Sequence, residues 1–135
     1  MPALPSDAKG LLMSAVEDPN PVIIIEHRWL YNIAGPVPAG DHRTPLGSPR
    51  CIREGNDLTI ASTSYMTIEA LRAAEMMENY GVSAEVIDIQ TLNPMDDNPV
   101  VDSVRKTGHL IVADTGWTSC GFAGEIVARV AEKAF

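Results

Sequence analysis

Basic and aromatic residues are scarce in this chain of 135 residues. There are 10 Lys and Arg against 18 Asp and Glu, and the net charge of −8 excludes a general affinity for nucleic acid or anionic membranes. Phe, Trp and Tyr make up only 5% of the residues, so a core has to be built from Ala, Val, Ile, Leu and Met. No apolar run is long enough to cross a bilayer and no basic, apolar leader begins the sequence, so we expect a soluble cytoplasmic protein without a membrane partner.

Metal-binding and catalytic patterns are also missing. The two cysteines, Cys51 and Cys120, form no CxxC pair, and we expect both to be reduced packing residues. The histidines His27, His42 and His109 include no pair at the helical spacing of a zinc site. There is neither a GxGxxG motif nor a phosphate-loop lysine. We therefore expect no catalytic, cofactor-binding or metal-binding residue in this chain.

The first third of the chain has one helix pattern and one strand pattern. Residues 7–17 predict a helix with Asp7 as an early cap. Its apolar face comprises Leu11, Leu12, Ala15 and Val16. The wholly apolar residues 22–25 predict a short strand. Residues 33–49 carry four Pro and three Gly, so we expect a linker without regular structure there.

From residue 58 onward, strand and helix patterns alternate. The expected strands are residues 58–61, 84–89 and 110–113, and the expected helices are residues 65–79, 98–106 and 121–134. Asn98 and Pro99 suit the start of a helix, and Gly108 suits its end. The expected inward face of the last helix comprises Phe122, Ile126, Val127, Val130 and Ala134. This alternation predicts a three-layer α/β fold with an open, mainly parallel sheet and right-handed crossovers.

Five motifs follow one another along the chain. They are PLG at 45–47, REGNDLTIAS at 53–62, GVSAEVIDIQTLNPMD at 81–96, KTGHLIVAD at 106–114 and GFAGEI at 121–126. In this order and spacing they resemble the C-terminal domain of the transketolase-like superfamily, most closely in beta subunits of thiamine diphosphate-dependent 2-oxoacid dehydrogenases. The resemblance implies that residues 1–35 are the remnant of an upstream pyrimidine-binding domain. Residues 36–52 are then a linker, and residues 53–135 are a C-terminal domain that lacks at least one further strand.

The resemblance also implies a function. Such enzymes oxidatively decarboxylate a 2-oxoacid on thiamine diphosphate and pass the acyl group to a lipoyl carrier, and the cofactor and its magnesium ion lie between two other domains. The C-terminal domain contributes to subunit association and to docking of the acyltransferase core. We therefore expect an assembly domain that holds no cofactor and has no turnover alone. The implied partners are further beta subunits, an alpha subunit and the acyltransferase core.

The loop at residues 114–121, DTGWTSCG, is the strongest site candidate within the chain. It joins an expected strand to the last expected helix, where backbone N–H groups and the helix dipole can hold an anion. Relatives commonly carry an acidic residue and a Gly-Gly pair here, whereas this chain has Thr115 and Cys120-Gly121. Because an exposed Trp is a typical partner anchor, we favour an interface over an anion site. The expected interface residues are Trp117, Cys120, Phe122, Glu125 and Arg129.

The remaining polar candidates have structural interpretations. Glu26 and His27 end an expected strand, but neighbours on a strand point to opposite faces and need not cooperate. Ser64 stands where relatives often have Gly, and we interpret Ser64 or Thr67 as a helix cap. The acidic residues interpreted as turn and cap residues are Asp88, Asp96 and Asp97.

Two other functions remain open. The chain is also compatible with the C-terminal part of a transketolase or a deoxyxylulose-phosphate synthase, which share PLG and a similar sheet. A free-standing binding module with the same fold is the non-enzymatic alternative, since a fold alone does not determine function. Pyruvate, branched-chain acids and acetoin all remain candidate substrates of the complete enzyme.

Overall fold

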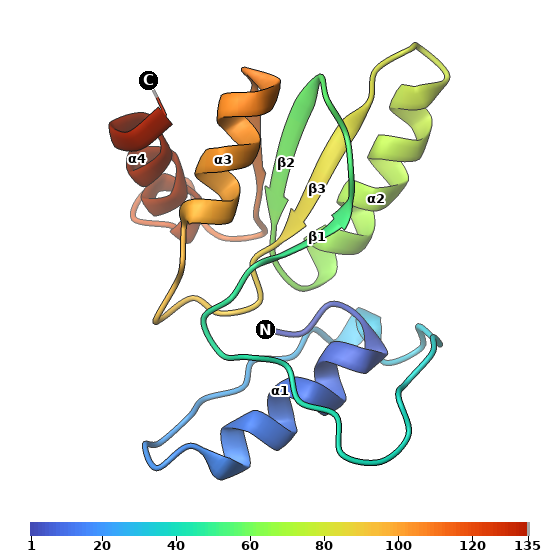
Figure 1. Cartoon of the computed structure of the whole chain (residues 1–135), viewed down its shortest axis with the longest axis vertical. Coiled ribbons are helices and arrows are strands. Elements are labelled where there is room, and N and C mark those ends of the chain that lie inside the picture. The colour runs from blue at the N-terminus through green and yellow to red at the C-terminus, as the bar shows by residue number, and fades with distance from the viewer. Residues whose placement is uncertain (135) are drawn as a thin grey trace.

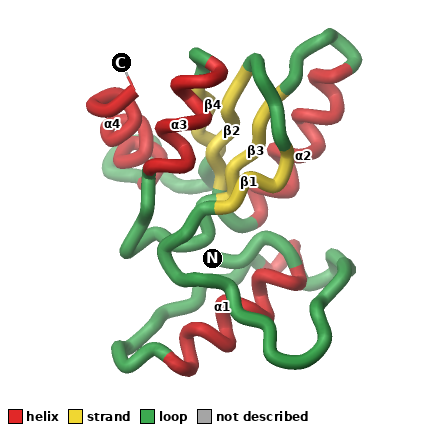
Figure 2. The backbone as a smooth tube through the Cα atoms, viewed as in Figure 1, coloured by secondary structure: helices red, strands yellow, loops and turns green. Residues whose placement is uncertain are grey.

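The structure, a computed structural model, describes residues 1–134 and has two parts (Figure 1). The first part contains helix α1 (Pro5–Glu17), the short 3-10 helix η1 (Arg28–Leu30) and long loops (Figure 2). The second part is a layered α/β unit. Its elements, in chain order, are β1 (Arg50–Arg53), β2 (Leu58–Ser62), α2 (Tyr65–Glu78), β3 (Ala84–Asp88), α3 (Asn98–Thr107), β4 (Leu110–Ala113) and α4 (Phe122–Ala134).

A four-stranded sheet runs through the second part in the order β1-β3-β2-β4. β2 pairs in parallel with both β3 and β4, which confirms the expected parallel strands. β1 pairs antiparallel with β3 and has a register irregularity between Cys51 and Arg53. The sequence did not predict β1, because the residues RCIR contain no apolar run and remain partly exposed at the sheet edge. The last residues of the linker expected over residues 36–52 therefore belong to a strand, which begins at Arg50.

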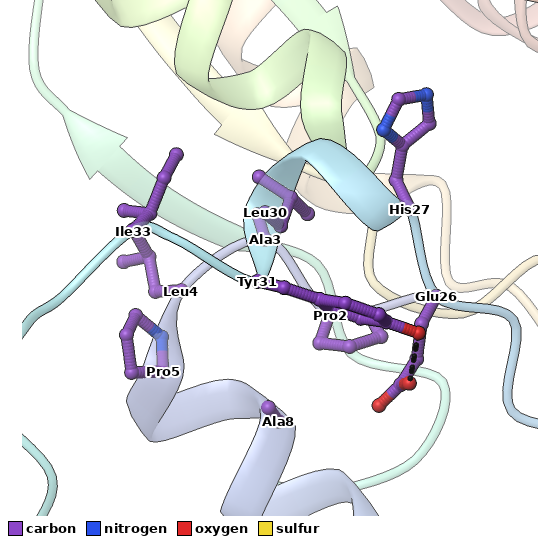
Figure 3. A pocket seen from close by; sticks show the side chains of 10 residues that line it. All are labelled: Pro2, Ala3, Leu4, Pro5, Ala8, Glu26, His27, Leu30, Tyr31 and Ile33. Atoms are coloured by element: carbon purple, nitrogen blue, oxygen red, sulfur yellow. Dashed lines mark hydrogen bonds between the residues drawn. The ribbon is translucent and has the colours of Figure 1, made fainter.

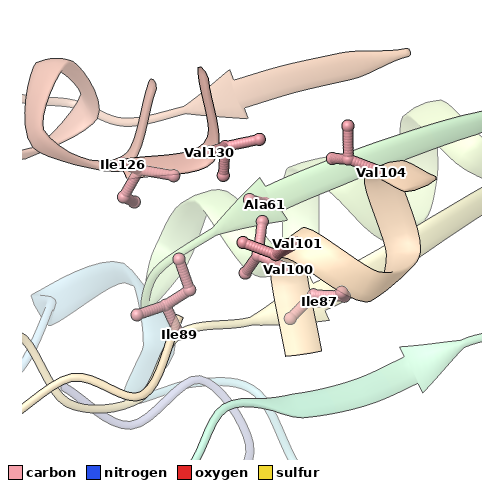
Figure 4. Close-up of a cluster of buried hydrophobic side chains, with 8 residues drawn as sticks. All are labelled: Ala61, Ile87, Ile89, Val100, Val101, Val104, Ile126 and Val130. Atoms are coloured by element: carbon pink, nitrogen blue, oxygen red, sulfur yellow. The ribbon is translucent and has the colours of Figure 1, made fainter. Parts of the chain in front are cut away.

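Helices cover both faces of the sheet, so the expected three-layer α/β fold is confirmed. On one face, Ala70 and Ala74 of α2 lie against Ile60, Ala84 and Val86. On the other face, α3 and α4 enclose a larger buried cluster (Figure 4). It comprises Ala61, Ile87, Ile89, Val100, Val101, Val104, Ile126 and Val130. Successive strand residues thus enter opposite layers, and a slip by one residue would exchange the two cores.

Helix α3 is attached to the sheet by polar contacts as well as by its apolar face. Thr59 of β2 forms buried hydrogen bonds with Ser103 at 2.6 Å and with Thr107 at 2.7 Å. Gly108 ends the helix at a φ of 73°, in the left-handed conformation that the sequence predicts for this glycine. At the other end Asp97, and not the expected Asn98, occupies the N-cap position. None of the helices within residues 1–134 has the length and apolar character to span a membrane.

Some details of the expected elements are wrong. Residues 22–25 form no strand and join no sheet; together with the loop at residues 90–94 they line a groove. Asp7 does not cap α1 but lies fully buried in its first turn. Val127, expected on the inward face of α4, is 50% exposed because it lies beside the buried stripe and not on it.

Candidate functional site

The loop at residues 114–121 lies open on the surface. Trp117 is 88% exposed, and Cys120 is exposed with a φ of 58°. A Cβ atom on Gly121 would lie only 1.9 Å from the carbonyl oxygen of Trp117, so this close approach of two backbone segments requires glycine. Asp114 accepts a hydrogen bond from the backbone N–H of Gly116 at 3.1 Å. The loop thus presents a bare indole on a locally constrained backbone.

The outer face of α4 continues this surface. Glu125 accepts a hydrogen bond from Arg129 at 2.6 Å, as the spacing of four residues predicts. Phe122 is half-buried and packs against the α3–α4 core, so of the five expected interface residues it is the one turned inward. Lys133 and Arg129 lie 2.6 Å and 3.8 Å from the carboxylate of Asp97, whose side chain is nearly buried. Asp97 therefore ties the start of α3 to α4.

A second polar group, which sequence reasoning missed, lies at the carboxyl edge of the sheet. Thr67 of α2 donates to Asp88 at 2.8 Å, and Gln90 donates to the other carboxylate oxygen of Asp88 at 3.3 Å. Ser62, the last residue of β2, donates to Thr67 at 3.1 Å. All four side chains are buried. Burial raises the pKa of the Asp88 carboxyl to about 6, against the lowering effect of the hydrogen bonds from Thr67 and Gln90.

An ion pair next to this polar group connects the sheet to the N-terminal part of the chain. Arg50 of β1 lies 2.9 Å from the carboxylate of Asp7, which is fully buried in α1. One oxygen of Asp7 and the side-chain oxygen of Gln90 have no hydrogen-bond partner within the described residues. The interpretation of Asp88 as a turn or cap residue is wrong, because it is the end of a strand buried on both faces. Asp88 lies beside Ser62 because β2 and β3 pair in parallel, and this pairing is not visible in a local sequence pattern.

Ser64 has a positive φ at the start of α2 and does not cap this helix as we expected. It is the N-cap residue of α2 with a φ of 50°, where glycine is favoured, and its hydroxyl makes no cap hydrogen bond. That hydroxyl is buried and has no partner within residues 1–134. Asp96, in contrast, is a turn residue, since it accepts a hydrogen bond from the backbone N–H of Asn98 at 3.0 Å.

Glu26 and His27 are separated by the structure. Glu26 accepts a hydrogen bond from Tyr31 at 3.2 Å at one end of a small pocket of about 180 Å³, and His27 points away from this pair (Figure 3). The imidazole ring stacks on Tyr65 with centroids 4.8 Å apart and meets Trp29 edge-on at 5.5 Å. The two side chains therefore do not form an acid–base pair. The histidine packs residues 27–29 against the first turn of α2.

No group of three or more His, Cys, Asp or Glu side chains within residues 1–134 is placed to hold a metal ion. Both cysteines are unpaired thiols and exposed, so neither has the packing role that we expected. The described side chains thus include an exposed loop with Trp117 and a buried polar group but no metal centre.

Comparison with known proteins identifies relatives of the whole chain. The family described as "Transketolase, C-terminal domain" matches residues 47–135. The chain is 41% identical to the acetoin:2,6-dichlorophenolindophenol oxidoreductase subunit beta of Cupriavidus necator, over 99% of this chain and 40% of the relative. It is 40% identical to the pyruvate dehydrogenase E1 component subunit beta of Bacillus subtilis, over 99% of this chain and 42% of the relative.

Two further matches agree with these. The mitochondrial 2-oxoisovalerate dehydrogenase subunit beta 2 of Arabidopsis thaliana is 40% identical over 100% of this chain and 38% of the relative. A solved chain described as "Split gene transketolase, inactive beta4 tetramer" has a TM-score of 0.63 and 35% identity, over 69% of this chain and 30% of that one. The chain spans about two fifths of the length of the curated relatives it matches.

Proposed function

Because the chain belongs to the transketolase C-terminal domain family, we propose that it serves as the assembly domain of a 2-oxoacid dehydrogenase beta subunit. The observation that carries the proposal is the identity of 40–41% to three beta subunits over 99–100% of the chain. That match includes residues before 47, where the family match begins. Residues 1–35 are, in this proposal, part of the domain that precedes the family domain in such subunits.

Thiamine diphosphate and magnesium belong, in this proposal, to other parts of the complete enzyme. The residues present here do not fit them. The acidic side chains at the carboxyl edge of the sheet, Asp7 and Asp88, are fully buried, and no metal-holding cluster occurs within residues 1–134. The complete enzyme would supply the oxidative decarboxylation, with pyruvate, 2-oxoisovalerate or acetoin as candidate substrates from the names of the relatives.

The assembly role is assigned to the Trp117 loop and the outer face of α4. A large indole that is 88% exposed has no packing role in the isolated chain, and such residues are enriched at the centres of interfaces. Cys120 belongs to the same loop, Glu125 and Arg129 form an ion pair on α4, and Phe122 anchors the start of α4 to the core. The partners proposed for this surface are further beta subunits, an alpha subunit and the acyltransferase core.

A transketolase assembled from separate chains is the second candidate. It is favoured by the fold match to the split-gene transketolase, a beta chain described as forming an inactive tetramer. Both candidates share the assembly role and self-association, and they differ in the alpha chain that completes the enzyme. The alpha chain that binds this domain therefore distinguishes the two candidates.

A chimeric beta subunit tests the proposal. This chain would replace the matching residues of the Bacillus subtilis pyruvate dehydrogenase beta subunit, co-expressed with that enzyme's alpha subunit. We expect a stable hetero-oligomer that oxidises pyruvate with dichlorophenolindophenol as acceptor. A folded chimera that does not bind this alpha subunit but assembles with a transketolase alpha chain would favour the second candidate. The 135-residue chain alone should give no saturable heat with thiamine diphosphate and magnesium in calorimetry.

A further inference from the structure

A single arginine lies between two buried carboxylates at the junction of the two parts. Arg50 is the first residue of β1, where the chain passes from the first part into the sheet (Figure 1). In the antiparallel pairing of β1 with β3, Arg50 is directly opposite Asp88. Residues directly opposite each other in a sheet project from the same face. The guanidinium of Arg50 nevertheless binds Asp7 of α1, at 2.9 Å from its carboxylate.

Both carboxylates need a counter-charge when they are ionised. Asp7 and Asp88 are fully buried, and an ionised carboxylate without a cation is costly to bury. Asp88 accepts hydrogen bonds from two neighbouring side chains, whereas one oxygen of Asp7 has no partner within residues 1–134. The Nε atom of Arg50 is also buried without a partner there, so the guanidinium has a donor left. One arginine therefore serves two carboxylates, one on each part.

The charged groups around Asp88 act on its ionisation in opposite directions. The pKa of Asp88 is raised to about 6, chiefly by burial and in part by the charge of Asp7, whereas Arg50 acts to lower it. The amino group of Met1 is the other charge that faces Asp88 from the first part. The helix α2 and the strand β2 contribute uncharged hydroxyl groups at this point. Ionisation of Asp88 therefore places a second carboxylate in competition with Asp7 for Arg50.

We propose that the guanidinium of Arg50 changes partner between Asp7 and Asp88, and that it thereby couples the ionisation of Asp88 to the attachment of the first part. When Asp88 is neutral, Arg50 pairs with Asp7 alone and holds α1 at the sheet edge. When Asp88 is ionised, Arg50 turns to it across the strand pair, and Asp7 is left with a buried charge that has no cation. The first part then opens more readily from the layered unit. This device goes beyond the proposed function, because it involves neither the Trp117 loop nor a partner chain.

The direction of the pH dependence follows from which state holds the proton more tightly. With α1 in place, the pKa of Asp88 is about 6. Opening removes the charge of Asp7, frees Arg50 for Asp88 and admits water, and each of these changes lowers the pKa of Asp88. The attachment of α1 is therefore strongest at low pH and weakens as the pH rises through about 6. A pKa difference of one pH unit between the two states changes the opening equilibrium about tenfold.

Hydrogen exchange of the backbone N–H groups of α1 measures this opening. We expect their protection factors to fall at least about tenfold from about pH 5 to about pH 7.5 in the unsubstituted chain. Asp88→Asn should abolish this fall, because Arg50 then has Asp7 as its only charged partner. Asp96→Asn, at an exposed turn, is the matched control and should keep the profile of the unsubstituted chain. Protection of α1 that does not change with pH, or that falls equally in the Asp88→Asn chain, would overturn the coupling.

A cycle of two substitutions tests the change of partner. The pKa of Asp88 is measured by carbon NMR of its carboxyl group in four chains: unsubstituted, Asp7→Asn, Arg50→Gln and the double variant. Where Arg50 is present, Asp7→Asn releases the guanidinium, and the pKa of Asp88 should fall by at least about one pH unit. In the Arg50→Gln chain there is no cation to release, so Asp7→Asn should lower that pKa by less than about half as much. Equal falls in both backgrounds would show that Arg50 does not change partner and would overturn the proposal. The exchange profile of the unsubstituted chain needs no change in this cluster, so it tests the coupling even where a variant does not fold.

The amino group of Met1 is the remaining charge to be controlled. Burial lowers its pKa below the ordinary value of 8.0, so it loses its charge toward the same pH range. Acetylation of this amino group removes the charge and leaves Asp7, Arg50 and Asp88 in place. We expect the acetylated chain to keep the fall in protection of α1 between about pH 5 and about pH 7.5. Loss of this fall on acetylation would assign the pH dependence to Met1 and overturn the proposal.

Discussion

The first 49 residues and the layered unit that follows them use apolar side chains in opposite ways. Of the 15 buried apolar residues of the described chain, only Ala3 and Leu11 lie in the first part. Of the 13 exposed large apolar residues, eight lie there. One part has therefore buried its apolar side chains between helices and sheet, whereas the other displays them. The difference indicates that the first part lacks a partner that the second part does not need for its fold.

Polar contacts replace a core in the first part. Ser14 donates to the carbonyl of Thr44 at 2.7 Å, and Lys9 donates to the carbonyls of Pro38 and Gly40, each at 2.7 Å. The Asp7–Arg50 pair then joins α1 to the sheet edge. Exposed hydrogen bonds such as those of Lys9 contribute little net stability each, and only two apolar residues are buried here, so this part should open more easily than the layered unit.

Truncation of a buried isoleucine in the layered unit should change the free energy of unfolding most, and truncation of an exposed isoleucine in the first part is its matched comparison. Ile87 is 1% exposed in the α3–α4 core, and Ile87→Ala should lower the free energy of unfolding by about 3–4 kcal/mol, because it removes buried methyl groups and leaves a cavity. Ile23 is 86% exposed, and Ile23→Ala should change it by no more than about 0.5 kcal/mol in the monomer. Urea unfolding at low protein concentration measures both. Similar losses in the two variants would contradict the contrast between the two parts.

The buried carboxyl of Asp88 should give the next largest effect, and its sign depends on pH. Its pKa in the folded chain is about 6, against an ordinary value of 3.8, chiefly because burial disfavours the charged form. The folded state therefore holds this proton more tightly than the unfolded state does. The stability from the protonated carboxyl is fully present below a pH of about 4 and is lost as the pH rises through about 6.

Asp88→Asn should consequently stabilise the chain by about 2–3 kcal/mol at pH 7 and lose this advantage below a pH of about 4. The amide of Asn can be accommodated because the side-chain oxygen of Gln90 has no partner and can accept its N–H. Urea unfolding at several pH values between 4 and 7 measures the difference from wild type. Asp96→Asn, at an exposed turn, is the control and should show no such trend. A destabilised Asp88→Asn chain at pH 7 would mean that the ionised form is the one the site favours.

Trp117 is the most exposed large apolar side chain in the described part of the layered unit. Trp117→Ala should weaken self-association or alpha-subunit binding at least tenfold, since anchors of this kind typically contribute about 2 kcal/mol. Tyr80→Ala is the matched control, because Tyr80 is 85% exposed on the same unit but lies outside the loop. Sedimentation velocity gives the dissociation constants, and circular dichroism reports the fold. Identical association of both variants would remove the loop from the interface.

The sequence predicted the elements that apolar periodicity defines. Apolar runs predict the three parallel strands, and apolar repeats at helical spacing predict the helices between them. The glycine at position 108 predicts the end of α3. β1 was not predicted, because this short edge strand has a basic residue at each end and no apolar run. The polar group around Asp88 was not predicted for a different reason. Its members Ser62, Thr67 and Gln90 come together through the parallel pairing of β2 with β3, which is a long-range event that local patterns do not contain.

The smallest expected effect concerns the contact between α3 and α4. Lys133 lies 2.6 Å from Asp97, whose side chain is only 8% exposed, so loss of the lysine leaves a nearly buried carboxylate with Arg129 at 3.8 Å as its remaining cation. Lys133→Met should lower the free energy of unfolding by about 1 kcal/mol. The control is Arg72→Met, because Arg72 and its partner Glu69 are both substantially exposed and such pairs contribute little. Urea unfolding suits this comparison, since a neutral denaturant does not screen the charges. A loss for Arg72→Met as large as that for Lys133→Met would show that burial of the partner carboxylate does not decide the strength of these pairs.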